Sequence, residues 1–515
     1  MTFIARLLLL CPLFLTFEAC QVPLRPYRLN SPSSEVPPLR LAGSPAAQPE
    51  TEKGCTAKTS ICLAFIEIDD MGEFFDKSEL DNALAIIRRV NASRQGDPIV
   101  LTFVHGWKNN AAPDNGNVAG FKIALQDLYA RLKGTRPIIG IYIGWRGNLI
   151  RPTWPVAQQF SYYNREAAAM RIPGAGLASS LTEIAARAHE NRRALAIFIG
   201  HSFGGLLLER TVSQATASAI AQATIYRQEA AQLRAGSPEA AERLHMAEAA
   251  TDARADLVIF INPAGAATEA MPLFNFLVNN SYRYQPNLPS DSPDMEDVHD
   301  ESQDADRPLF VSLTSTGDLA TKVAVPIGHA LPLLGFKVAG SFRNLDSGVP
   351  GAYSLSCFDP HAPHPHWQLK TKEEGALPQS SFYMSTAPHM QVLQSHRMLK
   401  AIGAAQMEVA STGEKITVHN PQAIAECSRE LFNQENLHVV STFRLVDTQN
   451  CFAIQERPNR CNGSPYWMME IDPDVVPDHS TIFTQRFIDF LIDTFFTTPT
   501  GKPIERGSPH LVQMR

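Results

Sequence analysis

The chain has 515 residues, which is enough for one large domain with insertions or for two domains. Apolar residues make up 44% of it, a usual share for a globular protein. The formal net charge is −7 and no basic stripe is visible, which argues against a nucleic acid as a partner.

The first 19 residues have the pattern of a signal peptide. Arg6 precedes an apolar run over residues 7–17, and Ala19 occupies the small-residue position before the expected cut. These features are typical of export, and the run is too short to cross a bilayer as a helix. We therefore predict export to the cell envelope, that is, to the periplasm or the outer membrane.

Cys20 directly follows the expected cut, which predicts a lipoprotein signal. Its thiol would carry the lipid, and the protein would be held at the membrane through that anchor. Phe17 and Glu18 differ from the leucine and the small or neutral residue that usually precede such a cysteine. The alternative is an uncleaved hydrophobic tail that tethers the protein.

The cysteine count also favours export. Of eight cysteines, Cys11 leaves with the signal and Cys20 carries lipid, so that six remain. An even number fits an oxidising compartment, whereas the alternative is six free thiols in a cytosolic enzyme. Two pairs would close short loops and the third pair follows by elimination: Cys55–Cys62, Cys451–Cys461 and Cys357–Cys427.

Strands and helices alternate along most of the chain. Residues 20–59 are rich in Pro and Ser and predict a tether, and a catalytic domain is predicted over 60–496, followed by a tail over 497–515. The alternation predicts an α/β fold with a mainly parallel central sheet flanked by helices. We expect strands at 63–68, 98–104, 137–145, 195–199, 256–261, 309–314 and 466–471, and helices at 77–93, 117–132, 177–190 and 481–496.

Three insertions interrupt this alternation. Residues 213–253 are rich in alanine and charge and predict a long helix or a helical pair. Residues 265–306 predict a helical cap or lid that ends in an acidic, solvated loop. Residues 340–460 are rich in Pro, His and Asn, and we expect a large irregular insertion before the last strand.

Residues 200–204 read Gly-His-Ser-Phe-Gly, directly between an expected strand and an expected helix. A serine in this context lies on a sharp, strained turn with its hydroxyl exposed above the sheet edge. Gly200 and Gly204 leave room for the turn to close. We therefore predict that Ser202 is a catalytic nucleophile.

A serine hydroxyl needs a base within hydrogen-bond reach, and the base needs an orienting carboxylate. Asp318 follows an expected strand by a short turn, and His479 lies between the last strand and the last helix. We predict these two as the acid and the base. The alternative acids are Asp346 and Asp359, and the alternative bases are His361, His364, His366, His389 and His396.

An acyl-transfer site also needs two backbone N–H groups for the developing oxyanion. The N–H of Phe203 is one candidate, and the N–H of Trp107, after Gly106, is the other. His105 and His201 are expected to support these loops rather than to titrate in catalysis.

The histidines at 361, 364 and 366 raise the question of a metal site. Prolines at 360, 363 and 365 prevent the helical spacing of zinc ligands, and no cysteine pair lies nearby. We expect neither a metal nor another cofactor.

With these motifs the chain resembles the α/β-hydrolase superfamily. It is also similar to a poorly characterised bacterial group that has His-Gly-Trp followed by Asn, here residues 105–110, and a strand ending in Gly-Trp-Arg-Gly, here 144–147. The resemblance covers about residues 60–330 and 465–496 and leaves the 340–460 insertion outside.

The resemblance implies a serine esterase or lipase whose substrate is a small-molecule or lipid ester, with membrane-derived acyl esters favoured by the anchor. Two alternatives stay open: a peptidase or amidase with the same triad, and a non-catalytic envelope protein that binds through the same fold. The acyl chain length and the oligomeric state do not follow from the sequence.

Overall fold

The computed structural model describes the greater part of the expected catalytic domain and short segments outside it. These are residues 22–28, 33–38, 55–56, 58–93, 96–149, 161–265, 272–273, 276–277, 309–315, 318, 390–394, 405–408, 415–418, 442–447, 452–456, 466–471, 475–495 and 512–514.

Seven parallel strands form the centre of the fold, in the order β2-β4-β3-β5-β6-β7-β13. Every residue of β2 to β7 is buried, because helices cover both faces of the sheet. This explains why the strand sequences are apolar runs without alternation. The bounds are β2 Ile61–Glu67, β3 Ile99–Val104, β4 Ile138–Gly144, β5 Leu195–His201, β6 Leu257–Ile261, β7 Phe310–Ser315 and β13 Tyr466–Ile471.

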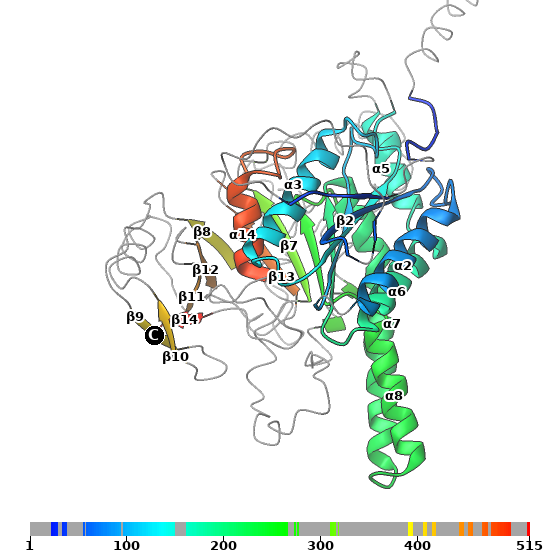
Figure 1. Cartoon of the computed structure of the whole chain (residues 1–515), viewed down its shortest axis with the longest axis vertical. Helices are drawn as coiled ribbons and strands as arrows, with labels where there is room; N and C mark the ends of the chain where they lie inside the picture. Colours follow the sequence, from blue (N-terminus) through cyan, green and yellow to red (C-terminus); the bar gives the residue numbers. More distant parts are fainter. Residues whose placement is uncertain are drawn as a thin grey trace, which may run out of the picture.

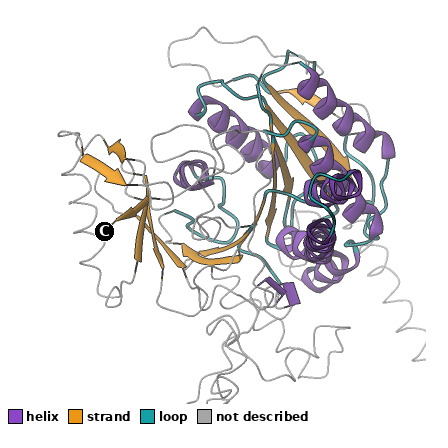
Figure 2. Ribbon diagram, turned by 90° about the horizontal axis from the view of Figure 1, so that it is seen from below, coloured by secondary structure: helices purple, strands orange, loops and turns teal. Residues whose placement is uncertain are grey.

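Helices pack on the two faces as separate layers (Figure 2). One face is covered by α2 and α5 to α7, and the other by α3 and α14. The prediction of an α/β fold with a mainly parallel sheet flanked by helices is thus confirmed. The bounds are α2 Lys77–Ala92, α3 Gly116–Arg131, α5 Tyr162–Arg171, α6 Ala175–His189, α7 Phe203–Gln232 and α14 Gln485–Phe495.

Part of the segment predicted as a tether belongs to the folded body. Strand β1, Ser33–Glu35, pairs antiparallel with β2. Arg28 is buried, and its guanidinium lies 3.9 Å from the centroid of the Phe65 ring. The composition of the segment did not indicate this packing. The packing depends on the edge of β2 and on the buried carboxylate of Glu67, and both are present only in the folded domain.

Strands also occur where an irregular insertion was expected. β8 pairs parallel with β13, and β12 and β11 continue the sheet by antiparallel pairing. β14, in the stretch predicted as a C-terminal tail, pairs antiparallel with β11. β9 and β10 form a separate antiparallel pair. The bounds are β8 Met390–Gln394, β9 Ala405–Glu408, β10 Lys415–Val418, β11 Thr442–Asp447, β12 Phe452–Glu456 and β14 Val512–Met514.

Helices α7 and α8 form a hairpin that projects from the body (Figure 1). The stretch predicted as a long helix or a helical pair is a pair, with α8 spanning Pro238–Asp252. The side chain of Ser237 caps α8 by accepting a 3.1 Å hydrogen bond from the N–H of Ala240. Among the helices of the described ranges, none is both long and apolar enough to cross a membrane.

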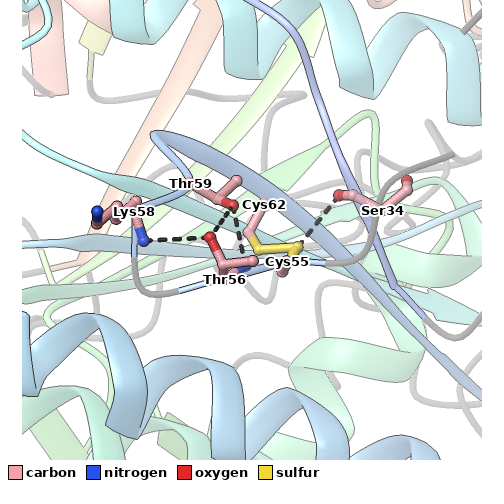
Figure 3. Close-up of a disulfide and its surroundings, with 6 residues drawn as sticks. All are labelled: Ser34, Cys55, Thr56, Lys58, Thr59 and Cys62. Carbon is pink, nitrogen blue, oxygen red and sulfur yellow. Dashed lines mark hydrogen bonds between the residues drawn. A yellow bond between two sulfur atoms is a disulfide. The ribbon is translucent and has the colours of Figure 1, made fainter.

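A disulfide joins Cys55 to Cys62, as predicted, with 5.8 Å between the Cα atoms (Figure 3). It ties the residues before β2 to the strand itself, and the Cys55 sulfur contacts the carbonyl of Ser34 in β1. The other predicted pairs, Cys451–Cys461 and Cys357–Cys427, lie outside the described residues, as do Cys20 and the signal segment.

Candidate active site

Ser202 occupies the turn between β5 and α7 with φ 56° and ψ −123°, a conformation that costs a non-glycine residue energy. The backbone around it holds the turn in place. The Ser202 N–H donates to the Ile261 carbonyl at 3.0 Å, and the Ser202 carbonyl accepts from the N–H groups of Leu206 and Ala264, both at 3.1 Å. The fold therefore fixes the serine in the strained turn that the motif predicted.

Gly204 allows this turn to approach the end of β3. A Cβ atom on Gly204 would lie 2.3 Å from the Val104 carbonyl oxygen and 2.4 Å from that of His105. Both are backbone atoms and cannot move aside. The glycine is thus required by close packing rather than by its own dihedral angles.

The structure brings Ser202, His479 and Asp318 together in a hydrogen-bonded chain. Ser202 Oγ lies 2.6 Å from His479 Nε2, and His479 Nδ1 lies 2.8 Å from Asp318 Oδ2. The Asp318 side chain is fully buried, whereas that of His479 is 19% exposed. This is the arrangement in which a base can take the serine proton while a carboxylate holds the imidazole ring.

The strand order explains why three distant residues meet. Ser202 follows β5, Asp318 follows β7 and His479 follows β13, and these strands lie close together in the order β5-β6-β7-β13. The carboxyl ends of parallel strands share one edge of the sheet. The Asp318 N–H donates to the Ser315 carbonyl at 3.2 Å, so a short turn presents the carboxylate directly at that edge.

Side chains from neighbouring strands hold the loop that carries His479. His201 Nε2 donates to the His479 carbonyl at 2.7 Å. Asn262 Nδ2 lies 3.4 Å and 3.5 Å from the carbonyls of Asp478 and His479, at the long limit for hydrogen bonds. Ser315 Oγ donates to the carbonyl of Val476. Groups at the ends of β5, β6 and β7 therefore position the imidazole through its backbone.

The sequence reasoning missed Asn262 and Ser315. Asn262 has φ 43°, and its Oδ1 accepts from the Ser315 N–H at 2.9 Å, so the two residues act as a unit. Asn262 follows β6, which lies between two candidate catalytic strands, and Ser315 is the last residue of β7, which is one of them. That position, a polar residue closing a buried strand, was the signal that could have identified them.

His201 and His105 are buried and neutral. Burial and, after it, the neighbouring His479 lower the pKa of His201 to about 3. Burial also lowers the pKa of His105 to about 4. The His105 ring stacks on Trp145, its Nδ1 donates to the Gly106 carbonyl at 2.9 Å, and its Nε2 accepts from the Trp145 N–H at 3.1 Å. Both histidines support loops.

The loop after β3 lies against the serine. A Cβ atom on Gly106 would lie 2.7 Å from Ser202 Cβ, so only glycine allows this approach. The Lys108 N–H donates to the Gly147 carbonyl at 2.8 Å and fixes the loop from the other side. Within the described part of the chain, the N–H groups of Trp107 and Phe203 donate to no other residue. The two N–H groups predicted as oxyanion donors belong to the residues that follow Gly106 and Ser202, which are in this close contact.

The Trp107 side chain packs near Phe203, the residue that follows Ser202, with 6.4 Å between the ring centroids. Its Nε1 donates to Ser161 Oγ at 3.1 Å, and its ring meets Tyr162 edge-on at 5.5 Å between centroids. Phe203 lies 5.0 Å from the same tyrosine ring. These aromatic contacts hold the residues whose N–H groups are the candidate oxyanion donors.

Several predicted residues cannot be placed. The alternative acids Asp346 and Asp359, the alternative bases at 361, 364, 366, 389 and 396, and most of the expected 265–306 lid lie outside the described residues. Among the residues with described positions, no cluster of three or more His, Cys, Asp or Glu side chains could hold a metal ion.

The chain matches no protein-family model, no curated protein and no solved structure. The geometry of the residues themselves is therefore the basis for any statement about function.

Proposed function

We propose that the chain is a serine hydrolase with an α/β-hydrolase fold that cleaves carboxylic esters. The observation that carries the proposal is the chain of hydrogen bonds from Ser202 through His479 to the buried Asp318. The strained turn at Ser202 and the two available N–H groups beside it supply the remaining parts of an acyl-transfer site.

In the first half-reaction Ser202 Oγ attacks the ester carbonyl and His479 Nε2 takes the serine proton. The carbonyl oxygen becomes an oxyanion, which accepts hydrogen bonds from the N–H groups of Phe203 and Trp107. Phe203 is the first residue of α7, so the positive end of the helix dipole also favours this charge. The intermediate then collapses, and the alcohol leaves with the proton from His479.

In the second half-reaction a water molecule attacks the acyl-serine. His479 takes a proton from the water and returns it to Ser202 Oγ when the carboxylic acid leaves. Asp318 stabilises the imidazolium that forms in each half, and it holds the Nδ1–H tautomer that leaves Nε2 free to act as the base.

A fluorophosphonate probe tests the nucleophile. We expect purified protein to be labelled, and Ser202→Ala and His479→Ala to lose labelling. Ser218→Ala and His245→Ala, exposed positions on α7 and α8, are the matched controls and should label as wild type. Equal labelling of all five proteins would refute the serine-hydrolase proposal and would leave a binding protein as the explanation of the fold.

Substrate class is decided on the labelled protein. A series of p-nitrophenyl esters of increasing chain length is compared with peptide p-nitroanilides. We expect Ser202-dependent hydrolysis of the esters. Faster Ser202-dependent cleavage of the anilides would replace the esterase proposal with an amidase or peptidase.

Export to the envelope is part of the proposal, and the Cys55–Cys62 disulfide supports it because such bonds persist in oxidising compartments. Cys20→Ser is expected to move the protein from the membrane fraction to the soluble fraction. An unchanged distribution would contradict lipid anchoring at Cys20.

A further inference from the structure

The segment just after the expected anchor is fixed to the domain. The N–H groups of Tyr27 and Arg28 donate to the Glu67 carboxylate at 2.6–2.9 Å, and Arg28 Nε donates to the Ala111 carbonyl at 2.7 Å. The Val22 N–H donates to the Leu149 carbonyl at 2.7 Å. Residues 22–28 are therefore bound to the body and do not act as a spacer.

This attachment is at the edge of the sheet that carries the candidate active site. Glu67 ends β2, Ala111 follows β3, and Leu149 follows β4, so all three partners lie beyond the carboxyl ends of parallel strands. The stretch before Leu149 includes Gly147, whose carbonyl accepts from Lys108, next to Trp107. Backbone contacts thus lead from Val22 to the loop beside Ser202.

The anchor is only a short distance away along the chain. Cys20 precedes Val22 by two residues, which span about 7 Å at most. If the hydrophobic run over residues 7–17 is retained instead, it ends five residues before Val22. With either anchor, the membrane cannot be far from this edge of the sheet.

Exposed side chains at this edge suit a lipid interface. Leu24 is 45% exposed and Met71, in the turn after β2, is 61% exposed. Arg25 lies next to Leu24, with its guanidinium 5.8 Å from the centroid of the Tyr27 ring. Apolar, aromatic and basic side chains together are the composition of an interfacial surface.

Two acidic side chains in the turn after β2, Asp69 and Asp70, are engaged within the protein. Asp69 accepts from the N–H groups of Met71 and Glu73 at 2.8 and 3.0 Å. Asp70 bonds to Arg165 and Arg146, which outweigh its burial and lower its pKa. These carboxylates can therefore keep their hydrogen-bond and ion-pair partners when this surface contacts a membrane.

We propose that this edge of the sheet rests on the bilayer that holds the anchor, so that the substrates are the acyl esters of membrane lipids in that surface. The substrate part of the proposal rests on the proposed ester hydrolase, whereas the orientation does not. The α7–α8 hairpin then projects away from the bilayer, because α7 starts at the candidate active site and runs past the other end of the sheet (Figure 1).

Orientation is tested on the full chain in vesicles of phosphatidylethanolamine and phosphatidylglycerol. An environment-sensitive thiol dye is attached to Met71→Cys or, as the matched control, to Leu244→Cys on α8, which is 50% exposed. Dye-treated wild type serves as the blank. We expect a blue shift and quenching by a bilayer-embedded quencher only for the dye at position 71. Equal signals at both positions, or a signal at position 244 alone, would overturn the proposed orientation.

The substrate class is tested with a linker of 20 Gly and Ser residues inserted between Gln21 and Val22. Such a linker has a root-mean-square length of about 25 Å, which releases the edge from the bilayer. We expect hydrolysis of the vesicle phospholipids to fall at least about tenfold through lost effective concentration, and hydrolysis of soluble p-nitrophenyl butyrate to stay unchanged.

Equal phospholipid hydrolysis with and without the linker, or no phospholipid hydrolysis by either protein, would refute the lipid-substrate proposal. Absence of p-nitrophenyl butyrate hydrolysis in both proteins would instead refute the proposed function. The dye experiment decides the orientation in either case.

Discussion

The edge of the sheet around Ser202 and the α7–α8 hairpin are built in opposite ways. At the edge, polar side chains such as Asp318, Asn262 and Ser315 are buried and engaged. At the hairpin, apolar side chains such as Ile225 and Leu244 are about half exposed, and the Arg243–Glu229 ion pair is partly open to solvent. Burying a polar group costs free energy unless the group is hydrogen-bonded. The buried polar side chains at the edge are hydrogen-bonded, and these bonds fix the positions of the candidate catalytic residues.

We expect the largest difference in kcat between two variants that each lose one carboxylate charge, one at the edge and one on the hairpin. Asp318→Asn should lower kcat for ester hydrolysis by about 10³–10⁴-fold, because an amide favours the wrong tautomer of His479. Glu242→Gln, an exposed position on α8, should leave kcat within about twofold. Steady-state kinetics on p-nitrophenyl butyrate make the measurement. A kcat for Asp318→Asn within tenfold of wild type would remove Asp318 from the proposed triad.

The same Gly-to-Ala change is expected to differ between the two regions. At Gly204 the new Cβ meets two backbone carbonyls at 2.3 and 2.4 Å, so Gly204→Ala should destabilise the protein by about 3 kcal/mol or more and reduce activity. At Gly236, between α7 and α8, the space is open but φ is +75°, and Gly236→Ala should cost only about 1–2 kcal/mol.

Urea denaturation and esterase activity check this pair. Activity of folded Gly236→Ala should equal that of wild type. A smaller loss of stability at Gly204 than at Gly236 would contradict the packing argument.

His201 is expected to act on catalysis only through position. His201→Phe removes the donor to the His479 carbonyl and should lower kcat about 10–100-fold with little change in KM. His201→Gln keeps an amide donor and should recover most of kcat. Because the pKa of His201 is about 3, the pH–kcat profile above pH 5 should keep its shape in His201→Gln. A displaced profile would show that His201 titrates in catalysis.

The smallest effect concerns a buried acid near the same edge. Glu79 accepts from the Glu67 N–H at 2.6 Å, and burial raises its pKa to about 7. Between about pH 4.5 and pH 7 the folded state therefore keeps a proton that the unfolded state has released. The free energy of unfolding falls as pH rises through this range and does not change further above pH 7. Glu79→Gln should reduce this fall and raise stability at pH 7, and Glu67, whose pKa burial also raises, should account for the fall that remains.

Urea midpoints between pH 4.5 and 8 measure the effect, with Glu242→Gln as the exposed control. The same slope in Glu79→Gln as in wild type would show that Glu79 does not cause the pH dependence.

The local parts of the site were predictable from sequence. Ser202 stands in a motif whose strand, glycines and helix are contiguous, and Asp318 and His479 each follow a buried strand. The α/β fold followed from the same alternation. These inferences rest on short, contiguous segments in which the pattern of apolar residues and glycines directly predicts the strand, turn or helix.

The parts that were missed depend on distant neighbours. Asn262 contacts Asp478, which is 216 residues away, and Tyr27 contacts Glu67 through its backbone N–H, which leaves no trace in side-chain chemistry. The strands between residues 390 and 456 have weak local signals, and pairing partners define them. Tertiary contacts decide such features, and composition does not report them.

The bond between Ser202 and His479 joins residues 277 positions apart, with the 340–460 stretch between them. Because His479 follows β13, the bond depends on the pairing of β13 with β7. Contacts this far apart in sequence are slow to form, so we expect the site to be completed late in folding. A chain that has formed the serine turn but has not yet paired β13 carries a nucleophile without its base. Hydrolytic activity would then appear only in the fully folded chain. The time at which activity appears during refolding would report when β13 pairs with β7.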